Sequence, residues 1–184
     1  MSILDIICRP IEFRRALERA RPRLYRIAYS WCRNTSVADD VVQEAMIKAL
    51  RYQRQLRDPQ AMDAWLFSIL ANCYRDHFRR RRDDEDIDEM DLPGDATPET
   101  EHAQNQVVRM VRAAIGRLPE GQRQVLTLVD LEGLSYEEVA TVLSIPTGTV
   151  MSRLCRGRRL LKQLLLPVLA HQAKSEVSGL WRVK

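Results

Sequence analysis

The residues best suited to chemistry lie in residues 134–162, where types and spacing fit contact with double-stranded nucleic acid. Ser135 followed by Glu138 forms a capping box, which predicts a helix start. The Ser-Ile-Pro break at 144–146 ends that helix, and a second helix opens at Thr147 with an N-terminus that favours phosphate. At helical spacing this second helix turns one stripe outward, where a major groove could be read: Met151, Ser152, Cys155, Arg156 and Arg159. The alternative is an ordinary helical hairpin with a solvated basic face.

A second candidate site lies on residues 61–82, whose unusually wide apolar arc is typical of the central helix of a bundle. A narrow polar strip remains, made by Ser68, Asn72, Arg75 and Arg79 at i, i+4, i+7 and i+11. Basic residues beside helix aromatics suit contact with phosphates and unstacked bases. The four consecutive arginines at 79–82 would also complement the helix dipole. That simpler explanation does not account for Asn72 in the middle of the strip.

A third feature is the amphipathic segment 37–51. Its apolar positions, which are expected to be buried, are Val42, Ala45, Met46, Ala49 and Leu50. Its exposed stripe consists of Asp40, Glu44, Lys48 and Arg51. A stripe of mixed charge is usually a solvated helix face, and the residues alone favour that interpretation.

Sparse Gly and Pro and few aromatic residues favour an all-α protein that positions these sites. Residues 11–33 are predicted as two helical segments, with Pro22 in the first turn of the second. Ser36 is expected to cap the following helix. Further helices are predicted at 104–117 and 120–131, and the last helix is expected to be interrupted at Pro167. Ser144, at the break between the two helices of the 134–162 segment, costs little in stability if it avoids positive φ.

Charge divides the 184-residue chain into three blocks. Residues 1–82 hold 17 Lys and Arg against 9 Asp and Glu, residues 83–101 hold 10 acids and no base, and residues 102–184 hold 12 bases against 6 acids. Pro93, Gly94 and Pro98 break any helix in the acidic block, which predicts a flexible linker. The organisation is therefore predicted as a helical domain at 1–82, a linker at 83–103, a second helical domain at 104–170 and a tail at 171–184.

Several classes of function are not supported. The four cysteines and three histidines show no catalytic or metal-ligand spacing, and Cys73 with His77 would supply only two ligands. We therefore expect no enzyme, no metal and no cofactor. Scattered cysteines, no signal peptide and no apolar run of about 20 residues indicate a cytoplasmic protein without membrane insertion. With no heptad run and no spare apolar face, a monomer is expected when the chain is free.

The motifs together resemble those of bacterial RNA polymerase sigma factors of the extracytoplasmic-function (ECF) subgroup, over residues 13–165. Residues 40–44 (DVVQE) resemble the D-x-x-Q-E signature of sigma region 2. Residues 64–80 resemble its segment with Ala-Trp-Leu, a later Asn and a final Arg-Arg. Residues 117–119 resemble the Leu-Pro opening of region 4, and 134–154 its helix-turn-helix. Four motifs in the right order and spacing make the resemblance specific.

The resemblance implies a factor that binds core RNA polymerase and directs promoter-specific transcription initiation. The implied partners are the clamp helices and flap of core polymerase, promoter DNA, and an anti-sigma factor that inhibits the protein. The implied target genes are those of a stress, envelope or metal response. The implied core-polymerase contacts are Asp40, Gln43 and Glu44. The implied minus-10 contacts are Ser68, Asn72, Arg75, Arg79 and Arg80. The implied minus-35 contacts are Thr147, Thr149, Met151, Ser152, Arg153, Cys155, Arg156 and Arg159.

The sequence departs from the family pattern at three positions. Met151 stands where relatives often carry Lys or Arg, Cys155 where many carry an aromatic or polar residue, and Ser144 where Gly is common. These changes imply fewer phosphate contacts at the minus-35 element. A stand-alone helix-turn-helix regulator is the alternative function, although it leaves residues 40–44 and Asn72 unexplained. A sigma-like decoy, which binds polymerase without opening promoters, is a further alternative.

Overall fold

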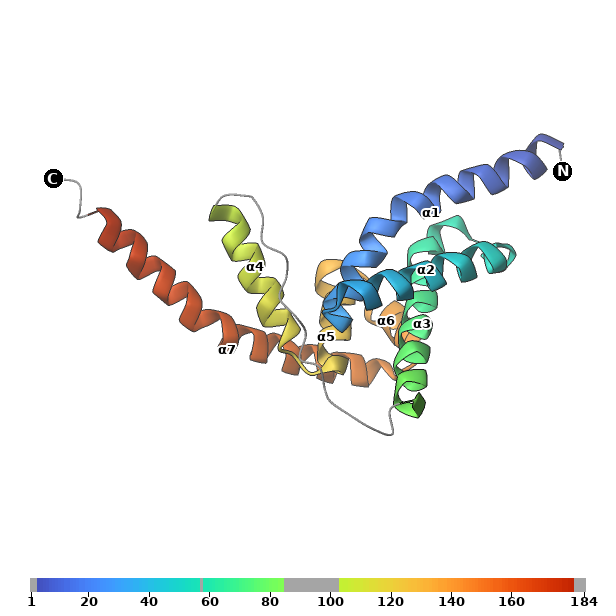
Figure 1. The fold of residues 1–184 in the computed structure, drawn as a ribbon. Helices are drawn as coiled ribbons and strands as arrows, with labels where there is room; N and C mark the ends of the chain where they lie inside the picture. Colours follow the sequence, from blue (N-terminus) through green and yellow to red (C-terminus); the bar gives the residue numbers. More distant parts are fainter. Residues whose placement is uncertain (1–2, 57, 85–102, 181–184) are drawn as a thin grey trace.

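Figure 1 shows the computed structural model of the chain, which describes residues 3–56, 58–84 and 103–180. Over these residues all regular structure is helical, as the composition predicts. The elements are α1 (Ile3–Cys32), α2 (Thr35–Tyr52), η1 (Gln53–Gln55), η2 (Pro59–Ala61), α3 (Met62–Asp84), α4 (Ala103–Gly116), α5 (Glu120–Leu126), η3 (Thr127–Leu131), α6 (Tyr136–Leu143) and α7 (Thr147–Leu180). The outer ends of α1 and α7 project toward opposite sides of the molecule. The segment predicted as a linker falls mainly on residues 85–102, outside the described residues.

The first three helices pack against one another as a bundle. Its core is built from side chains that are almost fully buried: Leu17, Leu24, Ile27 and Trp31 of α1, Val41 and Val42 of α2, and Phe67 and Leu70 of α3. The predicted break of the first helix at Pro22 is wrong, because α1 runs through this proline without ending. A proline inside a helix costs about 3 kcal/mol. Each large apolar side chain buried nearby contributes about 1.5–3 kcal/mol, so packing outweighs that cost.

The junction between α1 and α2 is set by two polar residues. Arg33 takes a left-handed conformation, with φ of 55°, and ends α1. Asn34, not Ser36, caps α2, since its side-chain oxygen accepts a hydrogen bond from the Val37 backbone N–H at 3.0 Å. The Arg33 side chain then lies over Gly116, where a Cβ atom would meet it at 2.6 Å. A glycine at 116 therefore lets the end of α4 approach the end of α1.

The helix-turn-helix forms where the sequence predicts it. Ser135 and Glu138 make the reciprocal capping box that starts α6. At its other end, the Ile145 N–H donates to the Ala140 carbonyl at 3.0 Å, which closes the helix in a Schellman arrangement. This arrangement needs a left-handed residue, and Ser144 supplies it with φ of 55°. The condition under which a serine costs little at this position, a negative φ, is therefore not met.

α7 combines the second helix of this motif with a long C-terminal extension. Val150, Leu154 and Gly157 are buried, as the helical spacing predicts. Gly157 faces α5, where an added Cβ would meet Gln122 at 3.4 Å. The predicted interruption at Pro167 is wrong, because α7 continues through it to Leu180. Residues 171–180, predicted as part of a tail, belong to this helix.

The N-terminal half (α1–α3) and the C-terminal half (α4–α7) share one continuous hydrophobic core. α1 packs against α4, α5 and η3, and α3 packs against α6. The indole N–H of Trp31 donates to the Thr127 hydroxyl at 2.8 Å, and both residues are fully buried. Arg23 forms ion pairs with Asp63 of α3 and with Glu132, which precedes α6 and has only 6% of its side chain exposed. The sequence predicts two domains but gives no signal for this packing.

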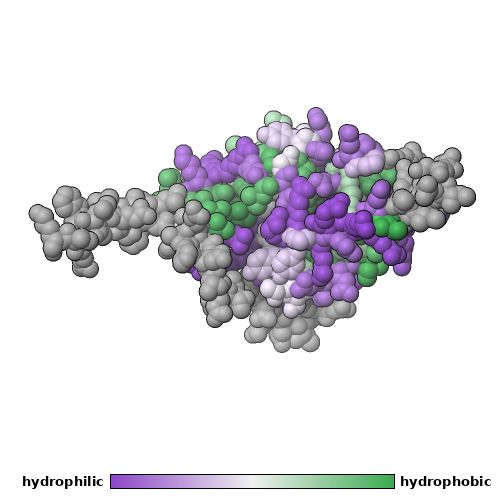
Figure 2. Space-filling view, turned by 90° about the horizontal axis from the view of Figure 1, so that it is seen from above, coloured by the Kyte–Doolittle hydropathy of each residue, from purple (hydrophilic) through white to green (hydrophobic). Residues whose placement is uncertain are grey.

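Figure 2 shows the molecule from above the view of Figure 1, coloured by hydropathy. Hydrophilic side chains cover much of the described surface, and hydrophobic ones gather toward the end where α4 and α7 emerge. Val108 of α4 and Leu166 of α7 are among the exposed large hydrophobic residues, at 43% and 53%. Leu160, Leu161 and Leu164, which precede Leu166 in α7, are partly buried against the core, and α7 packs against α4. We call the surface made by these five residues the α4–α7 apolar surface.

We predict that Ser144→Gly stabilises the protein by about 0.5–1 kcal/mol, because glycine adopts the left-handed conformation without the penalty that a Cβ atom imposes. The free energy of unfolding, measured by urea denaturation, checks this. Ser144→Ala is the matched control, since it keeps the Cβ atom and should give no gain. Equal stability of the glycine and alanine variants would contradict the argument.

We predict that Thr127→Val destabilises the protein by about 1–3 kcal/mol, because it leaves the buried Trp31 N–H without an acceptor at almost unchanged volume. The same denaturation experiment measures it. Thr141→Val is the control, because that exposed hydroxyl bonds only to a carbonyl of its own helix. If the Thr127→Val variant is as stable as the control, the Trp31–Thr127 hydrogen bond does not stabilise the protein as predicted.

Candidate nucleic-acid interface

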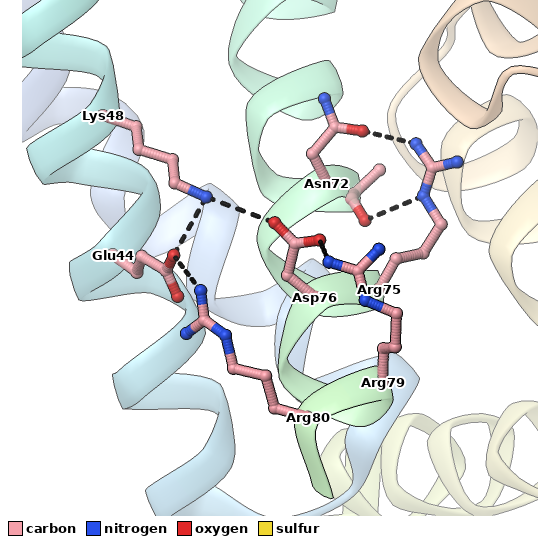
Figure 3. A network of polar contacts seen from close by, with 8 residues as sticks. Glu44, Lys48, Asn72, Arg75, Asp76, Arg79 and Arg80 are labelled. Atoms are coloured by element: carbon pink, nitrogen blue, oxygen red, sulfur yellow. Dashed lines mark hydrogen bonds and ion pairs between the residues drawn. The ribbon is translucent and has the colours of Figure 1, made fainter. Parts of the chain in front are cut away.

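The polar strip on α3 is exposed at Asn72 and Arg75, as predicted. The Arg75 guanidinium donates to the Asn72 side-chain oxygen and also reaches the Ala71 carbonyl at 3.4 Å (Figure 3). With its oxygen occupied, the Asn72 amide keeps its N–H donors for another partner. Ser68 is half-buried and donates to the Ala64 carbonyl of its own helix. The part of the strip that faces outward therefore consists of the Asn72–Arg75 pair and Arg79.

A charged network joins α2 and α3 beside this pair (Figure 3). Lys48 of α2 is its centre, with its ammonium 2.9 Å from Glu44 and 3.5 Å from Asp76 of α3. Arg79 pairs with Asp76 at 3.1 Å, and Arg80 lies 4.0 Å from Glu44. The hydrogen bond that the Lys48 ammonium donates to the Glu44 carboxylate raises the pKa of Lys48. Two sets of residues that the sequence assigns to separate functions therefore share one network.

Residue types and spacing do not identify the connecting members of this network as site residues. Lys48 was part of a stripe interpreted as solvated, and Asp76 was not considered as a site residue. The spacings of Glu44 with Lys48 and of Asp76 with Arg79 are ordinary helix pair spacings that could have suggested the two local pairs. The contact between Lys48 and Asp76 depends on the register between two helices.

The exposed face of α2 carries more than charge. Asp40 and Gln43 are exposed and Glu44 is half-exposed. Ile47 and Leu50 lie on the same face at helical spacing and are 52% and 38% exposed. The prediction that Leu50 is buried is therefore wrong. A patch with apolar residues flanked by acid and amide groups has the composition of a protein interface rather than of a purely solvated face.

The outward stripe of α7 is largely as predicted. Met151, Cys155, Arg156 and Arg159 are exposed, whereas Thr147, Thr149, Ser152 and Arg153 are half-buried. Ser152 and Arg156 are tied together, because the guanidinium donates to both the hydroxyl and the carbonyl of Ser152 at 3.2 Å. This pair forms the polar side of the stripe.

Two nearby arginines lie against other elements of the protein. The Arg153 guanidinium lies over Gly121 of α5, where an added Cβ would stand 2.9 Å from it. Arg158 pairs with Asp130 at 3.1 Å, and this hydrogen bond raises its pKa. Both are therefore held toward the α5–η3 side of the C-terminal half.

Three further observations concern the part of the chain that the structure describes. There, no group of three or more His, Cys, Asp or Glu side chains is placed to hold a metal ion. None of its helices is long and apolar enough to cross a membrane. Burial raises the pKa of the Cys73 thiol, which keeps it in the protonated form.

Comparison with known proteins gives the family. Residues 16–83 match the family described as Sigma-70 region 2, and residues 109–161 match Sigma-70, region 4. The RNA polymerase sigma-H factor of Pseudomonas aeruginosa is 38% identical over 144 residues, which are 72% of this chain and 75% of the relative. The ECF RNA polymerase sigma factor EcfG of Rhodopseudomonas palustris is 35% identical over 148 residues, 79% of this chain and 81% of the relative. The chain belongs to the ECF family of RNA polymerase sigma factors.

Solved structures of sigma factors share this fold. The sigma factor RpoE of Bartonella quintana, in complex with the anti-sigma factor NepR, matches with a TM-score of 0.75 and 29% identity, over 84% of this chain and 96% of that one. CnrH, in complex with the cytosolic domain of CnrY, matches with a TM-score of 0.58 and 28% identity, over 83% and 86%. The predicted family, the all-helical fold and the role of a non-enzymatic transcription initiation factor are confirmed.

Proposed function

We propose that this sigma factor uses three separate surfaces: α2 to dock on core polymerase, α3 to capture the opened minus-10 element, and α7 to read the minus-35 element. The observation that carries the proposal is the Asn72–Arg75 pair, exposed on the central helix of the bundle and next to the α2 face. A side chain with free amide donors beside guanidinium groups suits an unstacked base and its phosphates.

The docking surface on α2 consists of Asp40, Gln43 and Glu44 together with Ile47 and Leu50. Its apolar centre would supply the buried part of an interface, and its acidic and amide groups would supply charge and hydrogen bonds. Exposure of Ile47 and Leu50 supports this role, because burying them against a partner removes apolar area from water.

The minus-10 surface on α3 combines recognition and charge. Asn72 would donate to acceptors on a flipped base, since its oxygen is already held by Arg75. Arg79 and Arg80 would bind phosphates once they leave Asp76 and Glu44. Ser68 has the weakest support, because its hydroxyl is directed to its own helix.

The minus-35 surface on α7 consists of Thr147, Thr149, Met151, Ser152, Cys155, Arg156 and Arg159. Its support is the helix-turn-helix geometry, in which the second helix enters the major groove. Arg153 belongs to the same proposal as a phosphate contact that would have to leave its position over Gly121.

Control by an anti-sigma factor in the cytoplasm is the fourth part of the proposal. It is supported by the two solved relatives, whose structures are complexes with an anti-sigma factor or with the cytosolic domain of a partner. The α4–α7 apolar surface is a candidate contact for the polymerase flap or for such a partner, because Val108 and Leu166 are exposed on it.

Run-off transcription with core polymerase, with and without this protein, on a library of promoter fragments tests the function. Specific transcripts that require the protein would support it and would yield both promoter elements. Tight core binding without transcripts would instead support a decoy, and the absence of core binding would overturn the docking assignment.

We predict that Glu44→Lys weakens binding to core polymerase by about tenfold or more, the equivalent of about 1.4 kcal/mol, because it reverses charge within the docking surface. Affinity is measured with labelled protein and purified core enzyme. Glu18→Lys, which makes the same charge change at an exposed position of α1, is the control. Equal affinities for parent and Glu44→Lys would remove Glu44 from the interface.

We predict that Asn72→Ala lowers transcription and flattens base preference at one minus-10 position, by about 5- to 150-fold for a lost discrimination of about 1–3 kcal/mol. Transcription from promoters with single-base substitutions measures this, and core binding should not change. The control is Gln163→Ala, which removes an exposed carboxamide from a different helix, α7. This variant should keep the parental base preference at the minus-10 element. An Asn72→Ala variant with the parental base profile would show that this amide reads no base.

A further inference from the structure

The stripe of α7 that faces away from the core has an apolar centre. Met151 is 54% exposed, and Cys155 is exposed one helical turn later. Residues four apart on a helix lie next to each other on one face, so the two sulfur-containing side chains form one patch. Neither belongs to the hydrophobic core or to the side chains packed against it.

The groups around this patch are those of a DNA-reading helix. Ser152 and Arg156 are joined by hydrogen bonds at its edge, and Arg159 is exposed a turn beyond. The Arg153 guanidinium lies over Gly121 of α5, and Arg158 is paired with Asp130 of η3. The exposed part of the stripe at Met151 and Cys155 is therefore apolar, and the Arg156 guanidinium lies at its edge, hydrogen-bonded to Ser152.

Isolated exposed hydrophobic residues are common on protein surfaces and usually need no explanation. These two differ by position, because Val150, Leu154 and Gly157 fix the opposite side of the same helix against the protein. In a helix-turn-helix the side opposite that packing is the one that contacts base edges. The apolar feature that the major groove of ordinary DNA presents there is the 5-methyl group of thymine.

We propose that Met151 and Cys155 read thymine methyl groups in the minus-35 element, next to a guanine contacted by Arg156. This inference rests on the proposed minus-35 role of α7. It adds a chemical preference: specificity at this element comes partly from methyl contacts, where an Arg or Lys would give phosphate or guanine contacts.

The experiment uses the holoenzyme and the promoter selected by run-off transcription. Each thymine of the minus-35 element is replaced in turn by uracil, which pairs identically but lacks the methyl group. We expect transcription to fall about fourfold at one or two positions, since one buried methyl-sized group contributes about 0.8 kcal/mol. Uracil in the spacer serves as the DNA control and should have no effect.

Protein variants assign each methyl group to a side chain. Met151→Ala should abolish the effect of uracil at one position, and Cys155→Ala should abolish it at the other, because the contact is already lost. Leu131→Ala is the control variant, since it truncates an equally exposed apolar residue of η3 that lies outside the motif and outside the surfaces proposed for binding. It should keep the parental sensitivity at every position.

The outcomes separate this inference from the function on which it rests. Specific transcription with no uracil sensitivity, or a selected minus-35 element without thymine, overturns the methyl contacts and leaves the sigma activity standing. Uracil sensitivity that persists unchanged in both alanine variants also overturns the assignment. The absence of any specific transcript overturns the proposed function and this inference with it.

Discussion

The structure depends on one side chain, Trp31, which joins its two halves. It is fully buried at the end of α1, with its ring in edge contact with Tyr74 of α3 at a centroid distance of 5.4 Å. Its indole N–H donates to Thr127 of the C-terminal half, and its carbonyl accepts from the Tyr74 hydroxyl at 3.4 Å. Burial raises the pKa of Tyr74, so that hydroxyl stays a neutral donor. Three elements are therefore fixed by one residue whose polar groups are all paired.

This shared core has a consequence for a protein proposed to contact two separate DNA elements. If the two halves separated in order to contact both DNA elements, the Trp31–Thr127 hydrogen bond and the Arg23–Glu132 ion pair would break. It would also expose the apolar surfaces between α3 and α6. A buried donor left without an acceptor costs about 1–3 kcal/mol, so separation needs compensation from polymerase and DNA contacts. The recognition stripe of α7 is exposed already, whereas α3 is covered on its α6 side.

Local signals in the sequence were sufficient for part of this architecture. The Ser135–Glu138 capping box and the inward face of Val150, Leu154 and Gly157 depend only on residues within two turns, and both are as predicted. Pro22 and Pro167 mislead because helix propensity is a weak constraint that tertiary packing overrides. Ser144 takes a positive φ because the closing hydrogen bonds of α6 require a left-handed residue whatever its side chain.

Single residues of the candidate site could be predicted from the sequence, but the contacts between residues on different helices could not. Asn72 and Arg75 were found from spacing, because both lie on one helix. The network of Lys48 with Asp76 could not be found this way, since it requires the register between α2 and α3. Leu50 lies at the edge of an apolar arc, and whether such a residue is covered depends on which neighbouring helix reaches it. The periodicity of apolar residues in the sequence does not show which neighbouring helix covers Leu50.

The two kinds of ion pair in this protein differ in what it takes to break them. Exposed pairs contribute about 0–1 kcal/mol each, because water and salt replace them easily. The pairs of Arg79 with Asp76 and of Arg80 with Glu44 are of this kind, since both arginine side chains are more than 60% exposed. The Arg23–Glu132 pair is different, because the Glu132 carboxylate is buried and would lose its partner. Arg79 and Arg80, which are proposed to bind DNA, are thus kept near the minus-10 surface by weak ion pairs. The Arg23–Glu132 ion pair between the two halves is harder to break. Docking of core polymerase on Glu44 would therefore release Arg80 at a small cost in free energy. It would not break the contacts between the two halves, so their separation requires other contacts with polymerase or DNA.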